Sequence, residues 1–293
     1  MPKYRRKSES DDENTQEKEP QLTTSIILDG TYFFMALYNK LDGQWKKKST
    51  LDKHKNSYYD GYEFVNFYLE NIRIFLRELI VSIKIQSNVD DKTKLCKVYL
   101  TRGSKTSWRN NVNNEYLHSM NSKIVPLLDI IFKDNIGLDD VEVYQNFNLE
   151  SDDCIAIIVN KLITKNPDMF IHIISKNKRL IQLETDNITI TDINKKSLRD
   201  SSNILSNSLI FTPNKYLFFL ILKGDEERNI PRVFYEDKTD IEYDKYYDNN
   251  ELIAEECQDI ILAERLRNNY LICDYNSIPK KLVINFIKNN PTI

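Results

Sequence analysis

The sequence predicts an α/β fold, with a mainly parallel sheet flanked by helices and followed by a C-terminal helical lobe. Three observations support this fold class. Short apolar runs of strand length alternate with longer segments of helical periodicity, as in α/β proteins. These runs are apolar nearly throughout, which is typical of parallel strands covered on both faces. Beyond about residue 211 only helical patterns occur, so we divide the chain into a tail (1–22), an α/β core (23–210) and a helical lobe (211–293).

The predicted elements follow in chain order. The tail is polar and lacks the apolar side chains needed to offset its ordering entropy, so we expect it to be disordered. The first strand runs from Thr24 to Gly30, and a helix covers 62–85. Further strands are expected at 97–101, 141–144, 170–174 and 188–190. Further helices are expected from about 121, at 151–163 with Ser151 as N-cap, and at 216–222, 251–267 and 280–288, with a long acidic loop at 234–250.

Composition excludes several classes of protein. The net charge of −3, from 41 basic and 44 acidic residues, gives no overall attraction to nucleic acid, so DNA binding would need a local basic patch. Only 6 glycines are present, too few for a glycine-rich phosphate cradle. The 4 cysteines are far apart, which argues against a zinc site or a disulfide framework. No apolar run reaches the length of a membrane span, and we expect a soluble, cytoplasmic protein with no membrane partner.

Acidic residues follow the predicted strands at the edge where α/β proteins build their sites. Asp29 ends the first strand, and Glu150, Asp152 and Asp153 open the helix that follows the third strand. A further acid, Asp225, follows an apolar helix. Clustered carboxylates are the oxygen ligands that Mg²⁺ prefers, and paired metal ions can activate water against a phosphodiester. Taken singly, these acids could instead stabilise a helix N-terminus or form a turn.

Several sequence blocks occur in the order known from one family. Glu150-Ser151-Asp152-Asp153-x-Ile155-Ala156 resembles E-A-D-D-x-I-A, and 222–231 resembles L-x-G-D-x-x-D-N-I-P. Ile173-Ile174-Ser175 with Gln182-Leu183, Ser107-Trp108-Arg109 and the segment 269–279 match further blocks. Over about 23–290 the chain therefore resembles the PIN-like 5′-nucleases (flap endonucleases, 5′-3′ exonucleases and, most of all, phage-type RNase H). That resemblance implies a helix–three-turn–helix lobe that grips DNA and a role in phage or viral DNA replication.

The chain departs from the family pattern where metal ligands are expected. Thr101, Asn177, Arg179 and Arg228 occupy positions at which the family has aspartates. Each unit charge at roughly 4 Å interacts by about 4 kcal/mol at an effective dielectric of 20, so an arginine there should repel Mg²⁺. The segment 110–118 also lacks the cations that relatives use to hold a single strand.

The resemblance implies a set of site residues. The residual acidic site comprises Asp29, Glu150, Asp152, Asp153 and Asp225, of which Asp29, Glu150, Asp152 and Asp153 would hold at most one Mg²⁺. The expected DNA contacts, which do not all follow from the resemblance, are Arg109, Lys176, Lys178, Arg179, Lys223 and Arg228. Of these, Lys176, Lys178 and Arg179 depart from the family pattern and form either a new phosphate-binding patch or a solvated loop. His172 alternates within a strand and is interpreted as a core or surface residue rather than a ligand.

Three functions remain open at this point. The first is a weakened or inactive nuclease that binds DNA, such as flaps, nicks or RNA–DNA hybrids, or a replication protein. The second is a working Mg²⁺-dependent 5′-nuclease with a reduced acidic site. The third is a protein-interaction scaffold without nucleic-acid activity, with 236–250 as its contact surface.

Overall fold

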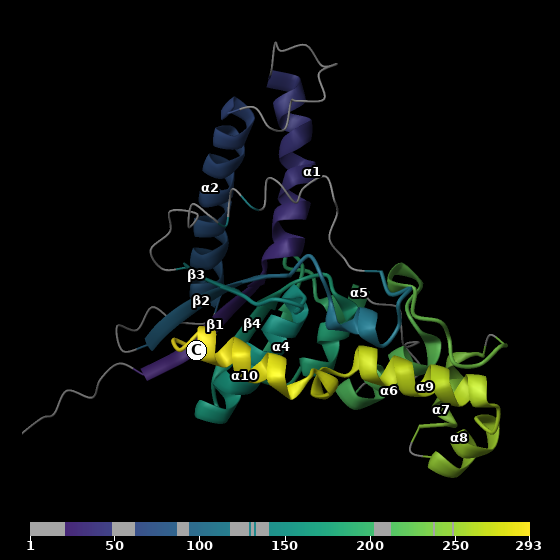
Figure 1. Cartoon of the computed structure of the whole chain (residues 1–293). Coiled ribbons are helices and arrows are strands. Elements are labelled where there is room, and N and C mark those ends of the chain that lie inside the picture. Colours follow the sequence, from purple (N-terminus) through teal and green to yellow (C-terminus); the bar gives the residue numbers. More distant parts are fainter. Residues whose placement is uncertain are drawn as a thin grey trace, which may run out of the picture.

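A five-stranded, all-parallel sheet forms the centre of the computed structural model, as predicted (Figure 1). The structure describes residues 21–48, 62–86, 94–117, 129, 132, 141–201, 212–236, 238–247 and 249–293. The sheet order is β3-β2-β1-β4-β5. The strands are β1 (Gln21–Asp29), β2 (Lys94–Arg102), β3 (Val141–Gln145), β4 (Phe170–Ile174) and β5 (Ile188–Thr191).

Helices cover both faces of the sheet and form the C-terminal region. The helices of the first part are α1 (Gly30–Lys48), α2 (Tyr62–Gln86), α4 (Ser151–Lys165) and α5 (Leu198–Ser201). The C-terminal helices are α6 (Pro213–Lys223), α7 (Asp240–Asp244), α8 (Asn250–Glu256), α9 (Ile260–Cys273) and α10 (Lys280–Asn289). The short 3-10 helices η2 (Trp108–Asn111), η3 (Lys178–Leu183), η4 (Glu226–Arg228) and η5 (Tyr275–Ser277) connect these elements. Figure 1 shows α1 and α2 rising together from the sheet, with α6 to α9 gathered away from them.

Alternating side chains of β1 supply two separate cores. Ile26 and Leu28 pack into the cluster that contains Phe33 and Phe34 of α1 and the apolar face of α2. Ile27, on the opposite face, joins the cluster formed by α4 and the C-terminal helices. Successive strand residues point to opposite faces, so a strand that is apolar throughout serves both cores.

The carboxyl ends of β1 and β2 lie close to the start of α1, beside the candidate site described below. Gly30 opens α1 directly after Asp29, and a Cβ there would lie 2.4 Å from the Thr101 carbonyl oxygen at the end of β2. Only glycine permits this approach of α1 to β2. The carboxyl ends of β1, β2 and β4 thereby meet the N-terminus of α4.

Several local expectations were wrong or incomplete. Glu150, and not Ser151, is the N-cap of α4. The helix expected over 251–267 is two helices, because Asp259 caps a new start at α9 with its side chain accepting from the Ile261 backbone. The expected loop over 234–250 contains α7, and α1 was not predicted.

Other expectations have a different outcome. The tail as far as residue 20 and the helix expected from about 121 lie outside the described residues, apart from 129 and 132. The 4 cysteines are free thiols, of which Cys154 and Cys273 are buried. No described helix has the length and apolarity needed to cross a membrane.

Candidate functional site

Three carboxylates at the N-terminus of α4 form a buried cluster. Glu150, Asp152 and Asp153 are 1%, 2% and 0% exposed. A capping box fixes two of them, because the Glu150 backbone N–H donates to Asp153 Oδ2 at 2.9 Å while the Glu150 side chain accepts from the backbone of Asp153. The positive end of the helix dipole contributes to their stability, but buried charges of this kind need direct partners.

Arg109 of η2 is the first such partner. Its guanidinium binds Asp153 in a bidentate manner, with Nη2–Oδ1 at 2.6 Å and Nη1–Oδ2 at 2.8 Å, and Nη1 reaches Glu150 Oε1 at 3.2 Å. Its Nε donates to the Ile272 carbonyl at 2.8 Å, so the side chain also ties η2 to the end of α9. Arg109 is fully buried. It therefore acts as an internal cation of the protein.

Arg179 of η3 is the second partner. Its Nη2 lies 2.7 Å from Asp152 Oδ2 and 3.5 Å from Glu150 Oε2, and the side chain is fully buried. Its Nε and Nη1 find no acceptor among the described residues, so burial of this guanidinium is incompletely compensated. Tyr275 donates a further hydrogen bond to Asp152 Oδ2 at 2.9 Å.

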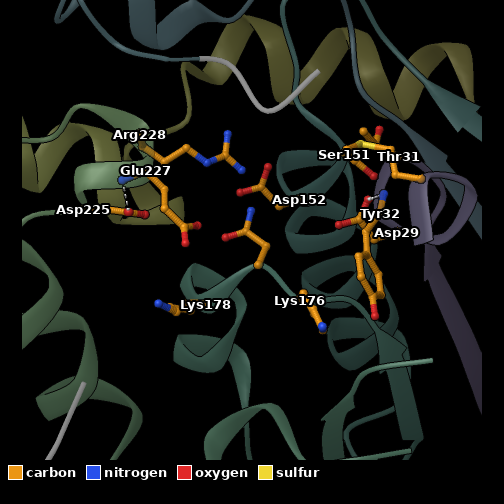
Figure 2. Close-up of a pocket in the computed structure, with 12 residues that line it drawn as sticks. Asp29, Thr31, Tyr32, Ser151, Asp152, Lys176, Lys178, Asp225, Glu227 and Arg228 are labelled. Carbon is orange, nitrogen blue, oxygen red and sulfur yellow. Dashed lines mark hydrogen bonds between the residues drawn. The ribbon is translucent and has the colours of Figure 1, made fainter. Parts of the chain in front are cut away.

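Arg228 of η4 completes the set from the C-terminal region. Its Nη1 donates to Glu150 Oε2 at 3.0 Å, and its side chain is 13% exposed. Figure 2 shows this guanidinium reaching across the pocket toward Asp152. Glu150 thus receives contacts from all three arginines.

The charges within this cluster balance. Three guanidinium groups face three carboxylates, and burial alone would lower the pKa of Arg109 and of Arg179. The adjacent carboxylates outweigh burial and raise both arginine pKa values, Asp153 and Glu150 acting on Arg109, and Asp152 and Glu150 acting on Arg179. Both arginines therefore remain charged, consistent with the delocalised guanidinium that proteins keep protonated.

Asp29 is the acid that lies outside this ion-pair network. It is 5% exposed, accepts hydrogen bonds from Ser175 Oγ at 2.7 Å and from the Tyr32 backbone at 3.2 Å, and no ion pair to it is found among the described residues. Burial raises its pKa, and these hydrogen bonds only partly oppose the shift. Beside it, Thr101 bonds to Ser151 Oγ at 2.6 Å and to the Leu28 carbonyl at 3.1 Å, so a neutral hydroxyl occupies the place of an expected acid.

A pocket of about 190 Å³ opens over Asp29 and Asp152 (Figure 2). Its rim carries Lys176, Lys178 and Arg228 together with Asp225 and Glu227. Asp225 caps η4, its carboxylate accepting from the Glu227 backbone at 3.1 Å. The structure therefore brings Asp225 to the same pocket as Asp29 and Asp152, whereas Glu150 and Asp153 do not line it.

Some of the expected DNA contacts are accessible in the structure, whereas others are held in ion pairs. Lys176 is exposed and Lys178 is half-buried at the pocket. Lys223 forms an ion pair with Asp240, and Arg228 is bound to Glu150. Arg109 and Arg179 correct the prediction, because both are fully buried and cannot present their guanidinium groups to a nucleic acid in this structure. The reason is electrostatic: each is held by the carboxylates of α4.

Sequence reasoning missed part of this network. Ser107 donates to Glu150 Oε1 at 2.7 Å, and Trp108 Nε1 donates to Asp153 Oδ2 at 3.1 Å. Both residues belong to a block that resembles the nuclease family, and Tyr275 belongs to another. Their positions in these blocks could have marked the residues as part of the site. The blocks do not indicate which carboxylate each side chain contacts.

The donor set does not fit a resident Mg²⁺ ion. Within the described ranges, no group of three or more His, Cys, Asp or Glu side chains is arranged to hold a metal. Glu150, Asp152 and Asp153 each bind a guanidinium group. A hard cation needs several free oxygen ligands, and here those oxygens already serve cations of the chain itself. This differs from the expectation that four acids could share one ion.

Comparisons with known proteins agree with the fold. No family model matches the chain. A 5′-3′ exonuclease of Buchnera aphidicola subsp. Schizaphis graminum is 32% identical over 135 residues, covering 44% of this chain and 45% of the relative. The 5′-3′ exonuclease of Buchnera aphidicola subsp. Acyrthosiphon pisum is 29% identical over 160 residues, covering 52% and 53%. The chain thus spans about half the length of the curated relatives that it matches.

Solved structures extend this likeness over most of the chain. A variant of bacteriophage T5 5′-exonuclease has a TM-score of 0.56 at 16% identity, covering 91% of this chain and 97% of its own. The zinc-bound T5 5′-exonuclease has a TM-score of 0.57 at 16% identity, with 92% and 99% coverage. A T5 flap endonuclease variant in a pseudo-enzyme–product complex with DNA and metal ions has a TM-score of 0.54 at 14% identity, with 91% and 97% coverage.

The structure is an α/β protein with a parallel sheet and with carboxylates gathered at its strand ends, where α/β proteins build their sites. The chain resembles curated 5′-3′ exonucleases in sequence over about half of their length, and it shares the fold of T5 5′-exonuclease.

Proposed function

We propose that this protein is a nuclease-derived DNA-binding protein in which arginines have replaced the catalytic metal ions and cleavage has been lost. The observation that carries the proposal is Arg179, whose buried guanidinium binds Asp152 and Glu150 at a position where the superfamily has an acid. A tethered cation at this position competes with any divalent ion for the same oxygens.

The energetics favour the arginines over a metal ion. A metal could enter only if the ion pairs of Glu150 and Asp152 were broken, which would leave buried guanidinium groups without partners. Breaking a buried ion pair costs about 3–5 kcal/mol, because the remaining charge is uncompensated. Mg²⁺ also gives up its hydration shell reluctantly. The folded protein therefore disfavours metal binding at this cluster.

Features that could hold DNA are retained. The turn after α6, which contains η4, begins at Gly224 with a φ of 72° and is closed by reciprocal backbone hydrogen bonds between Asp225 and Ile230, both at 2.9 Å. This turn belongs to the block that resembles the opening of the DNA-gripping motif. Lys176 and Lys178 lie beside it at the pocket rim, where they can meet phosphates.

We include the substrate class in the proposal: flapped or nicked DNA, or an RNA–DNA hybrid. Its support is the T5 flap endonuclease variant solved with DNA. A setting in phage or viral replication, with a replication protein as a further partner, rests on the resemblance alone.

The test is a nuclease assay beside gel-shift binding, using 5′-labelled flap, nicked and hybrid substrates with Mg²⁺ or Mn²⁺. We expect salt-sensitive binding without cleavage. A Glu150→Ala protein purified identically is the control for contaminating nucleases. Metal-dependent cleavage by the natural protein that Glu150→Ala abolishes would overturn the loss of catalysis.

A working nuclease with one metal is the second candidate, favoured by one observation. Asp29, which lies outside the ion-pair network, faces the same pocket as Asp152 and Asp225. Calorimetric titration with Mn²⁺ distinguishes the candidates. Binding at millimolar or lower concentration that Asp29→Ala abolishes would support this second candidate, and no heat of binding would exclude it.

A further inference from the structure

A second, larger cavity lies at the carboxyl ends of β2 and β3. Its volume is about 530 Å³, and its lining includes Arg102, Lys105, Asp129, Gln145 and Phe147. Ligand sites that hold small molecules or nucleotides commonly range from 300 to 1,000 Å³. None of these residues belongs to the carboxylate cluster or to the pocket over Asp29.

Phe147 is the unusual residue of this cavity. Its side chain is 70% exposed, the largest exposure of any phenylalanine described. The loop that carries it is nevertheless fixed, because the Leu149 carbonyl accepts from the Ser104 backbone at 2.7 Å and the Asn148 carbonyl accepts from the Trp108 backbone at 3.0 Å. Asn148 adopts a left-handed backbone with φ at 62°. The ring is thus presented to solvent by a pinned backbone, which lowers the entropy lost when a ligand stacks on it.

Basic side chains line the same cavity. Arg102 lies 4.8 Å from the Phe132 ring centroid and pairs with Asp129, and Lys105 lies 3.1 Å from the other oxygen of that carboxylate. Burial alone would raise the pKa of Asp129, but the hydrogen bonds and charges of Lys105 and Arg102 lower it. One carboxylate therefore faces two cations, which leaves one positive charge, and the Lys105 side chain is 64% exposed.

The cavity and the carboxylate cluster share a wall. A Cβ on Gly103 would lie 3.1 Å from the Ser151 backbone nitrogen at the start of α4. Leu149, which the Ser104 backbone holds, directly precedes Glu150. A strand leaving the candidate site on the β2–β3 side would therefore meet this cavity.

We propose that this cavity binds one nucleotide of single-stranded nucleic acid, with its base stacked on Phe147 and an adjacent phosphate held by Lys105. Proteins that bind single strands combine aromatic platforms with cations in this way, because every base offers a π-face and every linkage a negative charge. The exposed Gln145 side chain offers amide groups that can hydrogen-bond a base edge. The inference rests on the proposed DNA binding and adds the place where an unpaired strand is held.

The experiment uses the full chain and a single-stranded oligothymidylate that contains one 2-aminopurine. We expect the fluorescent base to be quenched on binding by the natural protein. Phe147→Ala should relieve the quenching and weaken single-strand binding about tenfold, within the range of about 1–3 kcal/mol per stacked base. Lys105→Glu should weaken binding comparably and reduce its salt dependence.

Matched controls come from the same chain. Phe170→Ala removes another exposed phenylalanine, 56% exposed at the start of β4, and Lys281→Glu reverses an exposed lysine on α10. Both variants should bind like the natural protein. Because Phe147 and Lys105 are largely exposed, the melting temperatures of their variants should remain unchanged.

The outcomes separate this inference from the proposed function. If both Phe147→Ala and Lys105→Glu bind single strands with unchanged affinity and quenching, the cavity is not a nucleotide site. The proposed function would still stand, because DNA binding is intact. Metal-dependent cleavage together with Phe147-dependent quenching would overturn the proposed loss of catalysis and support nucleotide binding at the cavity. No binding to any nucleic acid by the natural protein would overturn both.

Discussion

At the residue scale, the main difference between this site and a metal site is the sign of a few side chains. Arg179 and Arg228 stand where the superfamily pattern has acids, and each now contacts Glu150. A lost acid and a gained base together change the local charge by two units. Asp29 retains its place at the end of β1 but lies outside the ion-pair network.

Arg109 provides a test of the internal ion pairs. Replacing Arg109 by Met leaves Asp153 and Glu150 buried with fewer partners, so the free energy of unfolding should fall by about 3–5 kcal/mol. Urea unfolding measures the loss. Arg77→Met on the exposed face of α2 is the control and should change stability by less than about 0.5 kcal/mol. A loss below about 1 kcal/mol for Arg109→Met would contradict a tightly paired cluster.

His172 predicts a pH dependence of stability. Burial, with a smaller contribution from Lys195, lowers its pKa to about 4, and its ring nitrogens bond to Thr189 and Thr191. The unfolded histidine titrates near 6.5, so below that pH the unfolded chain binds a proton that the folded chain does not. Stability should be fully present above about pH 6.5 and decline by up to about 3 kcal/mol toward pH 4.

Comparison with His172→Gln isolates this contribution. The difference between the two stability curves, measured by urea unfolding from pH 4 to pH 8, should change over the window between pH 4 and 6.5. A difference that is independent of pH would show that His172 titrates normally in the folded protein.

At the element scale, the site is assembled by short helices rather than by the strands alone. η2, η3 and η4 each deliver one arginine to the N-terminus of α4. The capping box of α4 holds Glu150 and Asp153 in place to receive them. η3 and η4 carry Arg179 and Arg228, which bind Glu150 and Asp152, so removing these two side chains should free carboxylate oxygens for a metal ion.

The double variant Arg179→Asn/Arg228→Asn tests this idea. Without the two guanidinium groups, Glu150 and Asp152 lose buried partners, so the variant should be less stable than the natural protein without metal. Mn²⁺ at a hundred times its dissociation constant should then restore about 2.7 kcal/mol, or roughly 5–10 °C in melting temperature.

The natural protein should show no such response to Mn²⁺. If the double variant does not fold, Arg228→Asn alone serves, because Arg228 is partly exposed and its loss is milder. Equal Mn²⁺ responses in the natural protein and the variants would show that the arginines do not compete with the metal.

At the scale of the whole molecule, a net charge of −3 requires that any DNA affinity come from local cations. Lys176 and Lys178 are placed to provide it at the pocket rim. Lys176→Ala/Lys178→Ala should reduce the slope of log affinity against log salt by about 2 for duplex DNA, since each phosphate contact contributes about 0.9. The control Lys280→Ala/Lys281→Ala on α10 should leave the slope unchanged. Binding isotherms at several salt concentrations measure both.

The elements that the sequence predicted share one property. The five strands and the helices α2, α4, α6 and α10 have apolar patterns long enough to show their period, and each was found near its expected place. α1 was missed, although it directly follows β1, and the helix expected over 251–267 is divided at Asp259. Where a helix begins and ends depends on capping and on tertiary contacts, and apolar periodicity carries no information about either.

By itself, the sequence determined the parallel α/β fold, the superfamily likeness and the gathering of Asp29, Glu150, Asp152 and Asp153 at the strand ends. These follow from local patterns and from the rule that the carboxyl ends of parallel strands meet at one edge. Only the tertiary structure decided what those acids do. Arg109, Arg179 and Arg228 are distant in sequence from one another, and folding brings all three to the α4 N-terminus. Burial in a low-dielectric interior turned cations expected to meet DNA into internal partners, because a buried carboxylate needs an opposite charge beside it.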